Sequence, residues 1–306
     1  MTPASTAAVV VGLLAVLALP SGAKPTPPGR NGLIAFVSRG PQGVPQGLAV
    51  IRPDGGGFRY LTRDRRDRSP AWSADGKRLA FERARAIYAI GADGRKLTRL
   101  TSRLRGGRQP AWSPSGRELT FTRKGALFAM RADGTRQRLL FRRPGVVANR
   151  PSWSPDGKRI AFGVTAEEDE RGGHDAGSIV VVGHGGGAPR YLTDGRVEPA
   201  DNAEPGTWAE DRGPDWSPDG SRIVFTRLVW LCPRCDEDQV FSANVDGSGV
   251  VWVIHGWSWS PSWSPDGMLI AAATSDGLAI FTAAGARIRR LSRPGSSPAW
   301  QPLPSR

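Results

Sequence analysis

The sequence predicts an all-β protein, a closed ring of six four-stranded sheets, and a recurring motif carries this prediction. A twelve-residue unit, Pro-Ser-Trp-Ser-Pro-Asp-Gly-Lys-Arg-Ile-Ala-Phe, occupies residues 151–162. Close copies begin at Pro70, Pro110, Pro214 and Pro261, and a sixth copy begins at Pro298 and stops after its tryptophan. The six repeat tryptophans lie 40, 41, 63, 47 and 37 residues apart, which is the period of a four-stranded propeller blade with insertions in two blades.

Each unit reads as a β-hairpin. Trp153 ends one strand, Ser-Pro-Asp-Gly supplies the turn, and residues 159–162 alternate polar and apolar as the return strand. Proline presets φ at the first turn position, the aspartate bonds the backbone ahead of it, and glycine accepts a positive φ. A second apolar run closed by Asp-Gly follows, as at residues 87–94, and a short strand then ends near Leu-Thr, as at residues 100–101. This gives four strands in each repeat and no helical pattern.

The two ends of the chain complement each other. The first blade starts at its second strand, residues 32–36, and the chain ends on an isolated first strand at residues 298–300. We therefore expect the C-terminal strand to complete blade 1, which closes the ring and leaves no open sheet edge. The alternative is an open arrangement of six sheets.

The repeat resembles that of TolB-type six-bladed propellers, over roughly residues 31–301. The resemblance rests on the Pro-x-Trp-Ser-Pro-Asp-Gly-Lys-x-Ile-Ala-Phe unit, which is nearly whole in five copies. It implies the propeller fold and is less informative about function, because one fold serves many activities. About thirty residues precede the repeats, so we expect the N-terminal α/β domain of TolB to be absent.

The N-terminal segment predicts export. Residues 7–19 are apolar but too few to span a bilayer, and Ser21-Gly22-Ala23 supplies small residues for cleavage after position 23. We therefore divide the chain into a signal peptide at 1–23, a linker at 24–30, the propeller at 31–301 and a tail at 302–306. An uncleaved membrane anchor is the alternative. The expected location is secreted, periplasmic or associated with the cell envelope.

Charge is unevenly distributed along the chain. Residues 24–163 hold 30 Lys and Arg against 9 Asp and Glu, whereas residues 164–306 hold 12 against 19. The Asp-Gly turns should share one face of the ring, here called the turn face. The links between blades and the loops joining second and third strands should share the other, here called the link face. Most of the variation in length falls on the link face, which is therefore the expected binding face.

The basic half should display an arginine cluster on the link face. Arginine forks suit phosphate and carboxylate oxygens, so the cluster predicts an acidic partner, although Asp64 and Asp67 are interleaved with it and a solvated surface is the alternative. The principal candidates are Arg63, Arg65, Arg66, Arg68, Arg105, Arg108, Arg142 and Arg143, and the wider set adds Arg83, Arg85, Arg103 and Arg150. Nucleic acid is not expected, because no base-stacking aromatics accompany the cluster.

The acidic half combines carboxylates with tryptophans in or beside blade 5. Aromatic groups beside carboxylates suit a sugar or a cationic group, and packing of the long loops is the alternative. The candidate ligand-binding residues are Trp208, Trp230, Trp257 and Trp259. Cys232 and Cys235 have three interpretations: a local disulfide, which an exported protein favours, a redox pair, or half of a zinc site.

The sequence carries no standard catalytic motif. The chain lacks a Gly-x-Ser-x-Gly elbow and a His-Glu-x-x-His motif, and it holds three histidines. Carboxylates at the channel mouth would be the first catalytic suspects: Glu167, Asp169, Asp175, Asp215 and Asp236.

We therefore expect an exported, non-catalytic scaffold that binds a protein or an anionic envelope component through its link face. A carbohydrate- or small-ligand-binding module around blade 5 is the alternative, followed by a propeller hydrolase or lactonase with carboxylate or metal chemistry. We expect no cofactor, no metal, membrane contact only through an uncleaved signal segment, and a monomer.

Overall fold

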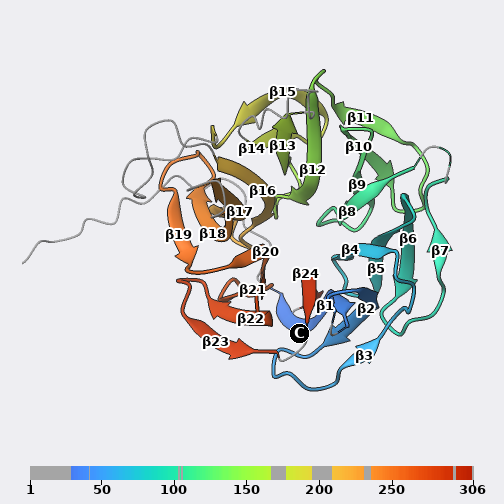
Figure 1. Cartoon of the computed structure of the whole chain (residues 1–306). Helices are drawn as coiled ribbons and strands as arrows, with labels where there is room; N and C mark the ends of the chain where they lie inside the picture. The colour runs from blue at the N-terminus through green and yellow to red at the C-terminus, as the bar shows by residue number, and fades with distance from the viewer. Residues whose placement is uncertain are drawn as a thin grey trace, which may run out of the picture.

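The computed structural model is a ring of six four-stranded antiparallel sheets (Figure 1), and the inner strands of the ring line a central channel. It describes residues 29–40, 42–102, 104, 106–166, 177–194, 209–230, 236–291 and 294–304. In every sheet the strand carrying the Pro-x-Trp motif is innermost and the following strands lie progressively outward. The predicted six-bladed propeller is therefore confirmed.

The strands occupy four concentric positions. The inner strands are β4 (Asp67–Trp72), β8 (Arg108–Trp112), β12 (Val146–Trp153), β16 (Ala209–Trp216), β20 (Ser258–Trp263) and β24 (Gly295–Leu303). The second strands are β1 (Arg30–Arg39), β5 (Arg78–Arg83), β9 (Glu118–Arg123), β13 (Arg159–Ala166), β17 (Arg222–Trp230) and β21 (Leu269–Thr274). The third strands are β2 (Pro45–Ile51), β6 (Ala86–Gly91), β10 (Ala126–Arg131), β14 (Ser178–Gly183), β18 (Asp236–Asn244) and β22 (Gly277–Thr282). The outer strands are β3 (Arg59–Tyr60), β7 (Thr98–Arg99), β11 (Arg138–Phe141), β15 (Gly186–Tyr191), β19 (Val251–Ile254) and β23 (Arg287–Arg290).

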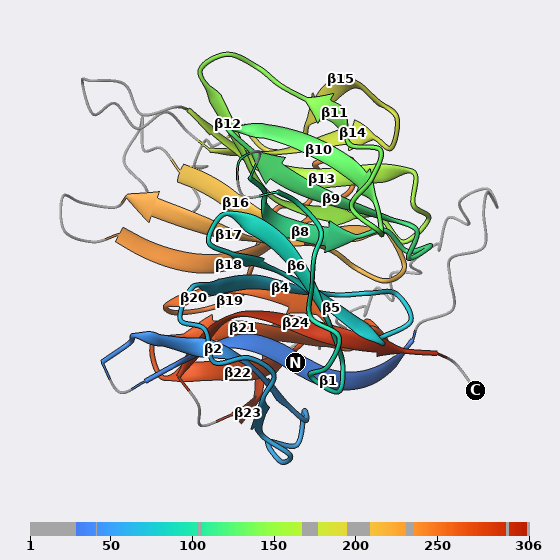
Figure 2. The same cartoon turned by 90° about the vertical axis from the view of Figure 1, so that its right-hand side faces the viewer.

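The ring closes as predicted, because β24 pairs antiparallel with β1 and gives blade 1 the order β24-β1-β2-β3. Figure 2 shows the first and last strands side by side. The side chain of Gln301 on β24 accepts a hydrogen bond from the backbone of Leu33 at 2.9 Å and donates one to the carbonyl of Gly76 at 2.7 Å. The last strand thus ties blade 1 to blade 2 as well as completing it.

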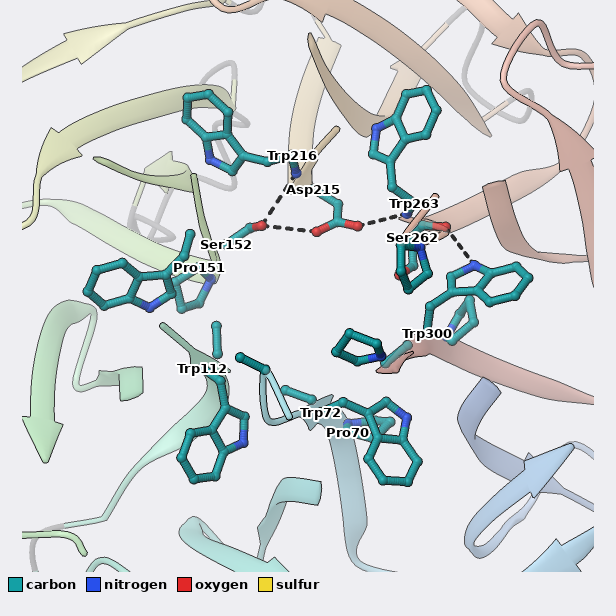
Figure 3. A pocket seen from close by; sticks show the side chains of 18 of the residues that line it. Pro70, Trp72, Trp112, Pro151, Ser152, Asp215, Trp216, Ser262, Trp263 and Trp300 are labelled. Carbon is teal, nitrogen blue, oxygen red and sulfur yellow. Dashed lines mark hydrogen bonds between the residues drawn. The ribbon is translucent and has the colours of Figure 1, made fainter. Parts of the chain in front are cut away.

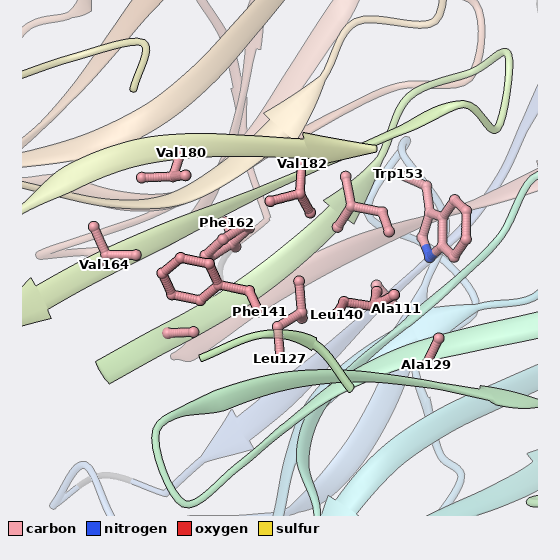
Figure 4. Close-up of a cluster of buried hydrophobic side chains, with 12 residues drawn as sticks. Ala111, Leu127, Ala129, Leu140, Phe141, Trp153, Phe162, Val164, Val180 and Val182 are labelled. Atoms are coloured by element: carbon pink, nitrogen blue, oxygen red, sulfur yellow. The ribbon is translucent and has the colours of Figure 1, made fainter. Parts of the chain in front are cut away.

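The core consists of six apolar clusters, one between each pair of neighbouring blades. The cluster between blades 3 and 4 packs Phe141 against Phe162, with ring centroids 5.0 Å apart, and places Trp153 at its inner end (Figure 4). Because both faces of every sheet are covered, Ile160, Ala161 and Phe162 are all buried. The predicted polar–apolar alternation of the return strand is therefore replaced by a continuous buried run.

Candidate functional site

The inner strands enclose a cavity of about 560 Å³ on the axis of the ring. Its wall is built from the same tetrapeptide in each blade, the residue before the repeat proline through the repeat tryptophan. The repeat prolines line the cavity, and the labelled indoles point away from it, into the spaces between blades (Figure 3). The repeated motif thus forms the wall around the cavity, and the residues before and after each proline determine whether the wall is polar or apolar.

The residue before each repeat proline adopts a left-handed backbone conformation. Such a φ is uncommon for residues other than glycine, and the residue before proline normally prefers an extended backbone. The strand register shifts at the same point in every blade, which marks a β-bulge. The six residues line the cavity and have φ between 44° and 62°: Ser69, Gln109, Arg150, Gly213, Ser260 and Ser297.

The residue after each proline divides the wall into an apolar and a polar half. Blades 1, 2 and 3 place alanine there, whereas blades 4, 5 and 6 place Ser152, Asp215 and Ser262. Figure 3 shows Asp215 between the two serines. The cavity is therefore suited to a ligand with one apolar and one polar side.

Asp215 links three blades through its carboxylate. One oxygen accepts a hydrogen bond from the Ser152 hydroxyl at 3.0 Å, and the other accepts from the backbone amide of Trp263 at 2.8 Å. Burial raises the pKa of Asp215 to about 6, and the hydrogen bonds from Trp263, Ser152 and Ser262 act in the opposite direction. Asp215, a sequence-predicted carboxylate that lies in the described cavity wall, therefore has a pKa closer to neutral than an ordinary aspartate.

Arg150 lines the cavity, in place of the predicted position in the arginine cluster of the link face. Its guanidinium crosses from blade 4 to blade 6 and donates a hydrogen bond from Nη1 to the hydroxyl of Ser260. Burial and the neighbouring Arg212 guanidinium lower the pKa of Arg150, while the Asp238 carboxylate acts in the opposite direction. The prediction for this residue was wrong because the bulge before Pro151 turns the side chain inward.

The link-face arginines follow three consecutive blade links. Exposed side chains come from the β3–β4 link, the start of β8 and the β11–β12 link: Arg63, Arg65, Arg66, Arg108, Arg142 and Arg143. Arg66 pairs with Asp64 at 2.7 Å, and Arg143 donates to the Tyr191 hydroxyl at 2.7 Å. Arg105 lies outside the described residues.

Two arginines that were predicted to belong to this cluster form contacts within the protein instead. Arg83 forms a bidentate pair with Asp67, a fully buried carboxylate, through contacts of 2.5 and 2.8 Å. Arg68 donates to the backbone carbonyls of Arg65 and Asp67. The prediction that Arg83 is displayed was wrong, because its side chain lies over the ring of Phe81 between the sheets.

The candidate tryptophans of blade 5 are dispersed. Trp257 is 55% exposed in the link to blade 6, whereas Trp259 is partly buried against the apolar cluster between blades 6 and 1. Trp230 ends β17, and its side chain lies outside the described part of the chain. Trp208, Cys232, Cys235, Glu167, Asp169 and Asp175 are also outside it, as is the side chain of Asp236.

Sequence reasoning missed most of the cavity residues. Gln109, Ser152, Ser260 and Ser262 were not among the candidates, although they flank repeat prolines. One feature of the sequence could have identified them. The residue after the repeat proline varies among alanine, serine and aspartate, whereas the proline and the tryptophan around it do not vary. This variation indicates a cavity wall only if the Pro-x-Trp strand is known to be the innermost strand of each blade.

The described residues form neither a metal-ligand cluster nor a membrane-spanning helix. No group of three or more His, Cys, Asp or Glu side chains in this part of the chain is placed to hold a metal ion. Nor does a helix within these ranges have the length and hydropathy needed to cross a membrane.

Comparisons with known proteins establish the fold. TolB from Acinetobacter baumannii superposes with a TM-score of 0.66 at 24% identity, covering 89% of this chain and 67% of that one. A putative TolB from Agrobacterium tumefaciens gives 0.64 at 18% identity, covering 90% and 99% of the two chains. A chain of a nidogen/laminin complex gives 0.66 at 12% identity, covering 88% and 98%. No protein-family model and no curated protein matches the chain by sequence.

These similarities define a six-bladed propeller of the TolB type at the level of fold. The predicted resemblance to the TolB propeller is confirmed at that level.

Proposed function

We propose that this chain is an exported, non-catalytic propeller scaffold that binds an acidic protein or envelope partner through the arginines of its link face. The observation that carries the proposal is the arc of exposed arginine over three consecutive links. Arg63, Arg65 and Arg142 form no ion pair within the described ranges of the chain, and Arg63 stacks on Tyr60 at 4.4 Å. Positive groups that form no internal ion pair attract an anionic surface over a distance of about 10 Å at moderate salt.

The rigid ring suits this role because it holds loops from different blades in fixed relative positions. A propeller of similar fold occurs in a nidogen/laminin complex, which supports the use of this scaffold in protein binding.

The test compares two variants that lose the same charge. In the first, Arg63, Arg65 and Arg142 are changed to serine, and in the second, Arg287, Arg289 and Arg290 of the outer strand β23 are changed to serine. Both proteins are used to capture partners from the native envelope fraction at low salt. We expect the first variant alone to lose the captured partner, and we expect the wild type to release it as salt rises. A partner that both variants retain, or that high salt does not release, would contradict the proposal.

A further inference from the structure

A partly buried cation in the cavity wall, Arg150, forms no ion pair within the described part of the chain. The guanidinium of Arg150 makes one side-chain hydrogen bond, to the neutral hydroxyl of Ser260. No carboxylate within the described ranges of the chain lies within ion-pair distance of it. The two other enclosed arginines at the link-face end behave differently: Arg83 binds Asp67 and Arg227 binds Asp211, each through two contacts of 2.9 Å or less. Asp238 acts on Arg150 from beyond ion-pair distance. A largely desolvated charge that no ion pair neutralises is costly, so the cavity beside Arg150 is a candidate site for an anionic ligand.

A second donor lies next to Arg150. The side-chain oxygen of Gln109 accepts hydrogen bonds from the Arg150 backbone amide at 3.0 Å and from the Thr122 hydroxyl at 3.1 Å. Two donors on the oxygen fix the orientation of the amide, so its nitrogen is left as a donor. That nitrogen has no partner within the described part of the chain, and Gln109 lines the same cavity.

The neighbouring blade is adapted to the path of Arg150. Five blades carry a residue with a side chain before the repeat proline, and blade 5 carries Gly213. A Cβ atom at position 213 would lie 3.0 Å from Cδ of Arg150 and 3.5 Å from its Nη1. The backbone itself does not demand glycine, because Ser260 and Gln109 adopt nearly the same φ. Gly213 thus provides the space through which Arg150 reaches blade 6.

We infer that the channel binds the carboxylate group of a small organic acid, held by Arg150 together with Ser260 and Gln109. A planar guanidinium matches a carboxylate through two parallel hydrogen bonds. The cavity of about 560 Å³ lies within the range for small-molecule sites, and the alanines of blades 1, 2 and 3 offer an apolar surface to the rest of the ligand. This site is independent of the link-face cluster, and either proposal can fail without the other.

The test measures binding to the full chain by calorimetry and by ligand-dependent change in Tm. The probes are succinate and its uncharged analogue succinamide, with triglycine and triglycinamide to ask whether the carboxylate comes from a free acid or from the end of a peptide. We expect one acid to bind and its amide not to bind. Succinate binding assigns a free acid as the source, and binding of triglycine alone assigns a chain end.

Three variants locate the site. Arg150→Gln should weaken binding by about tenfold to a hundredfold, because it removes a charge-assisted contact. Gly213→Ala should weaken it while keeping the charge, since it displaces the guanidinium. Arg289→Gln, at an exposed arginine of the outer strand β23, should bind like the wild type. The inference is overturned if neither acid binds, if the amides bind equally well, or if Arg150→Gln retains wild-type affinity while its thermal unfolding shows a folded protein.

Discussion

At the scale of single residues, the buried charges of this propeller fall into two kinds. Asp211 and Arg227 satisfy each other through bidentate contacts in blade 5, as Asp67 and Arg83 do in blade 2. Removing one member of such a pair leaves an uncompensated charge and costs about 3–5 kcal/mol. Within the described ranges, the hydrogen-bond partners of Asp215 and Arg150 are neutral groups. The paired charges connect strands, whereas the unpaired ones lie in the wall of the cavity.

Asp215 therefore lowers the free energy of unfolding at neutral pH. Its pKa is about 6 in the folded protein against 3.8 in the unfolded chain, so the folded state binds the proton more tightly and stability falls as pH rises between these values. The shift corresponds to about 3 kcal/mol. We expect Asp215→Asn to raise the urea midpoint at pH 7.5 and to have no such effect below pH 4. An amide still accepts the Trp263 hydrogen bond, and the Ser152 hydroxyl can accept from its nitrogen.

The matched control for this prediction is Asp219→Asn in the turn of blade 5. Burial opposes the shift, but hydrogen bonds from Ser217 and Ser221 lower the pKa of Asp219, so its carboxylate stabilises the fold at neutral pH. The two variants should shift the urea midpoint in opposite directions at pH 7.5. If both destabilise the protein equally, the high pKa of Asp215 is wrong.

At the scale of elements, the repeated hairpin turn depends on one carboxylate. In blade 4, Asp156 accepts hydrogen bonds from the Ser154 hydroxyl at 2.6 Å and from the Lys158 backbone amide at 3.0 Å. Blade 3 has Ser115 at this position, and its hydroxyl lies 3.1 Å from that of Ser113 and 3.4 Å from the Arg117 amide. The side-chain hydrogen bonds of the turn are therefore weaker in blade 3 than in the other hairpins, where an aspartate accepts them.

Ser115→Asp should stabilise the protein by about 1 kcal/mol at pH 7, because a charged acceptor replaces a weak neutral one. Burial opposes the shift at Asp156, but hydrogen bonds lower the pKa of that carboxyl. The equivalent gain should be present above the unfolded pKa and disappear as pH falls through the folded pKa. Urea unfolding at pH 7 and pH 3 measures it, and Ser115→Asn supplies the uncharged control, whose effect should not change with pH. Loss of stability at pH 7 would argue against this account of the turn.

The hairpin turns could be predicted from the sequence and the channel residues could not, because only the turns are determined by adjacent residues. The hairpins were predictable because Ser-Pro-Asp-Gly encodes its turn within four adjacent residues. The position of Arg150 was not, because it depends on a bulge at Pro151, an acceptor at Ser260 and the missing side chain of Gly213, which belong to three blades. Likewise, Arg83 and Arg143 look alike in the sequence, and the buried carboxylate of Asp67 distinguishes them only in the folded ring.

At the scale of the whole molecule, the ring is held by contacts between blades and by the strand that joins its ends. The apolar clusters lie between sheets, so no blade has a complete core of its own. Asn31 of blade 1 bonds Asp266 of blade 6 at 2.8 Å, beside the closing strand β24. On β24, Trp300 packs in the cluster between blades 6 and 1 and donates from its indole to the Ser262 carbonyl at 3.1 Å. Closure therefore involves both backbone pairing and burial of a large side chain.

Deleting residues 295–306 should lower the stability of every blade together, because it opens the ring and exposes the clusters on both sides of the gap. We expect a large fall in Tm with a single unfolding transition, while a chain shortened only by residues 304–306 should unfold like the wild type. Trp300→Ala, which keeps the strand, should cost about 3–5 kcal/mol. Trp257→Ala, at an indole that is 55% exposed, should stay within about 0.5 kcal/mol of the wild type. Two separate transitions in the truncated chain would show that the blades fold independently, and an unchanged Tm would show that closure by β24 contributes nothing to the stability of the ring.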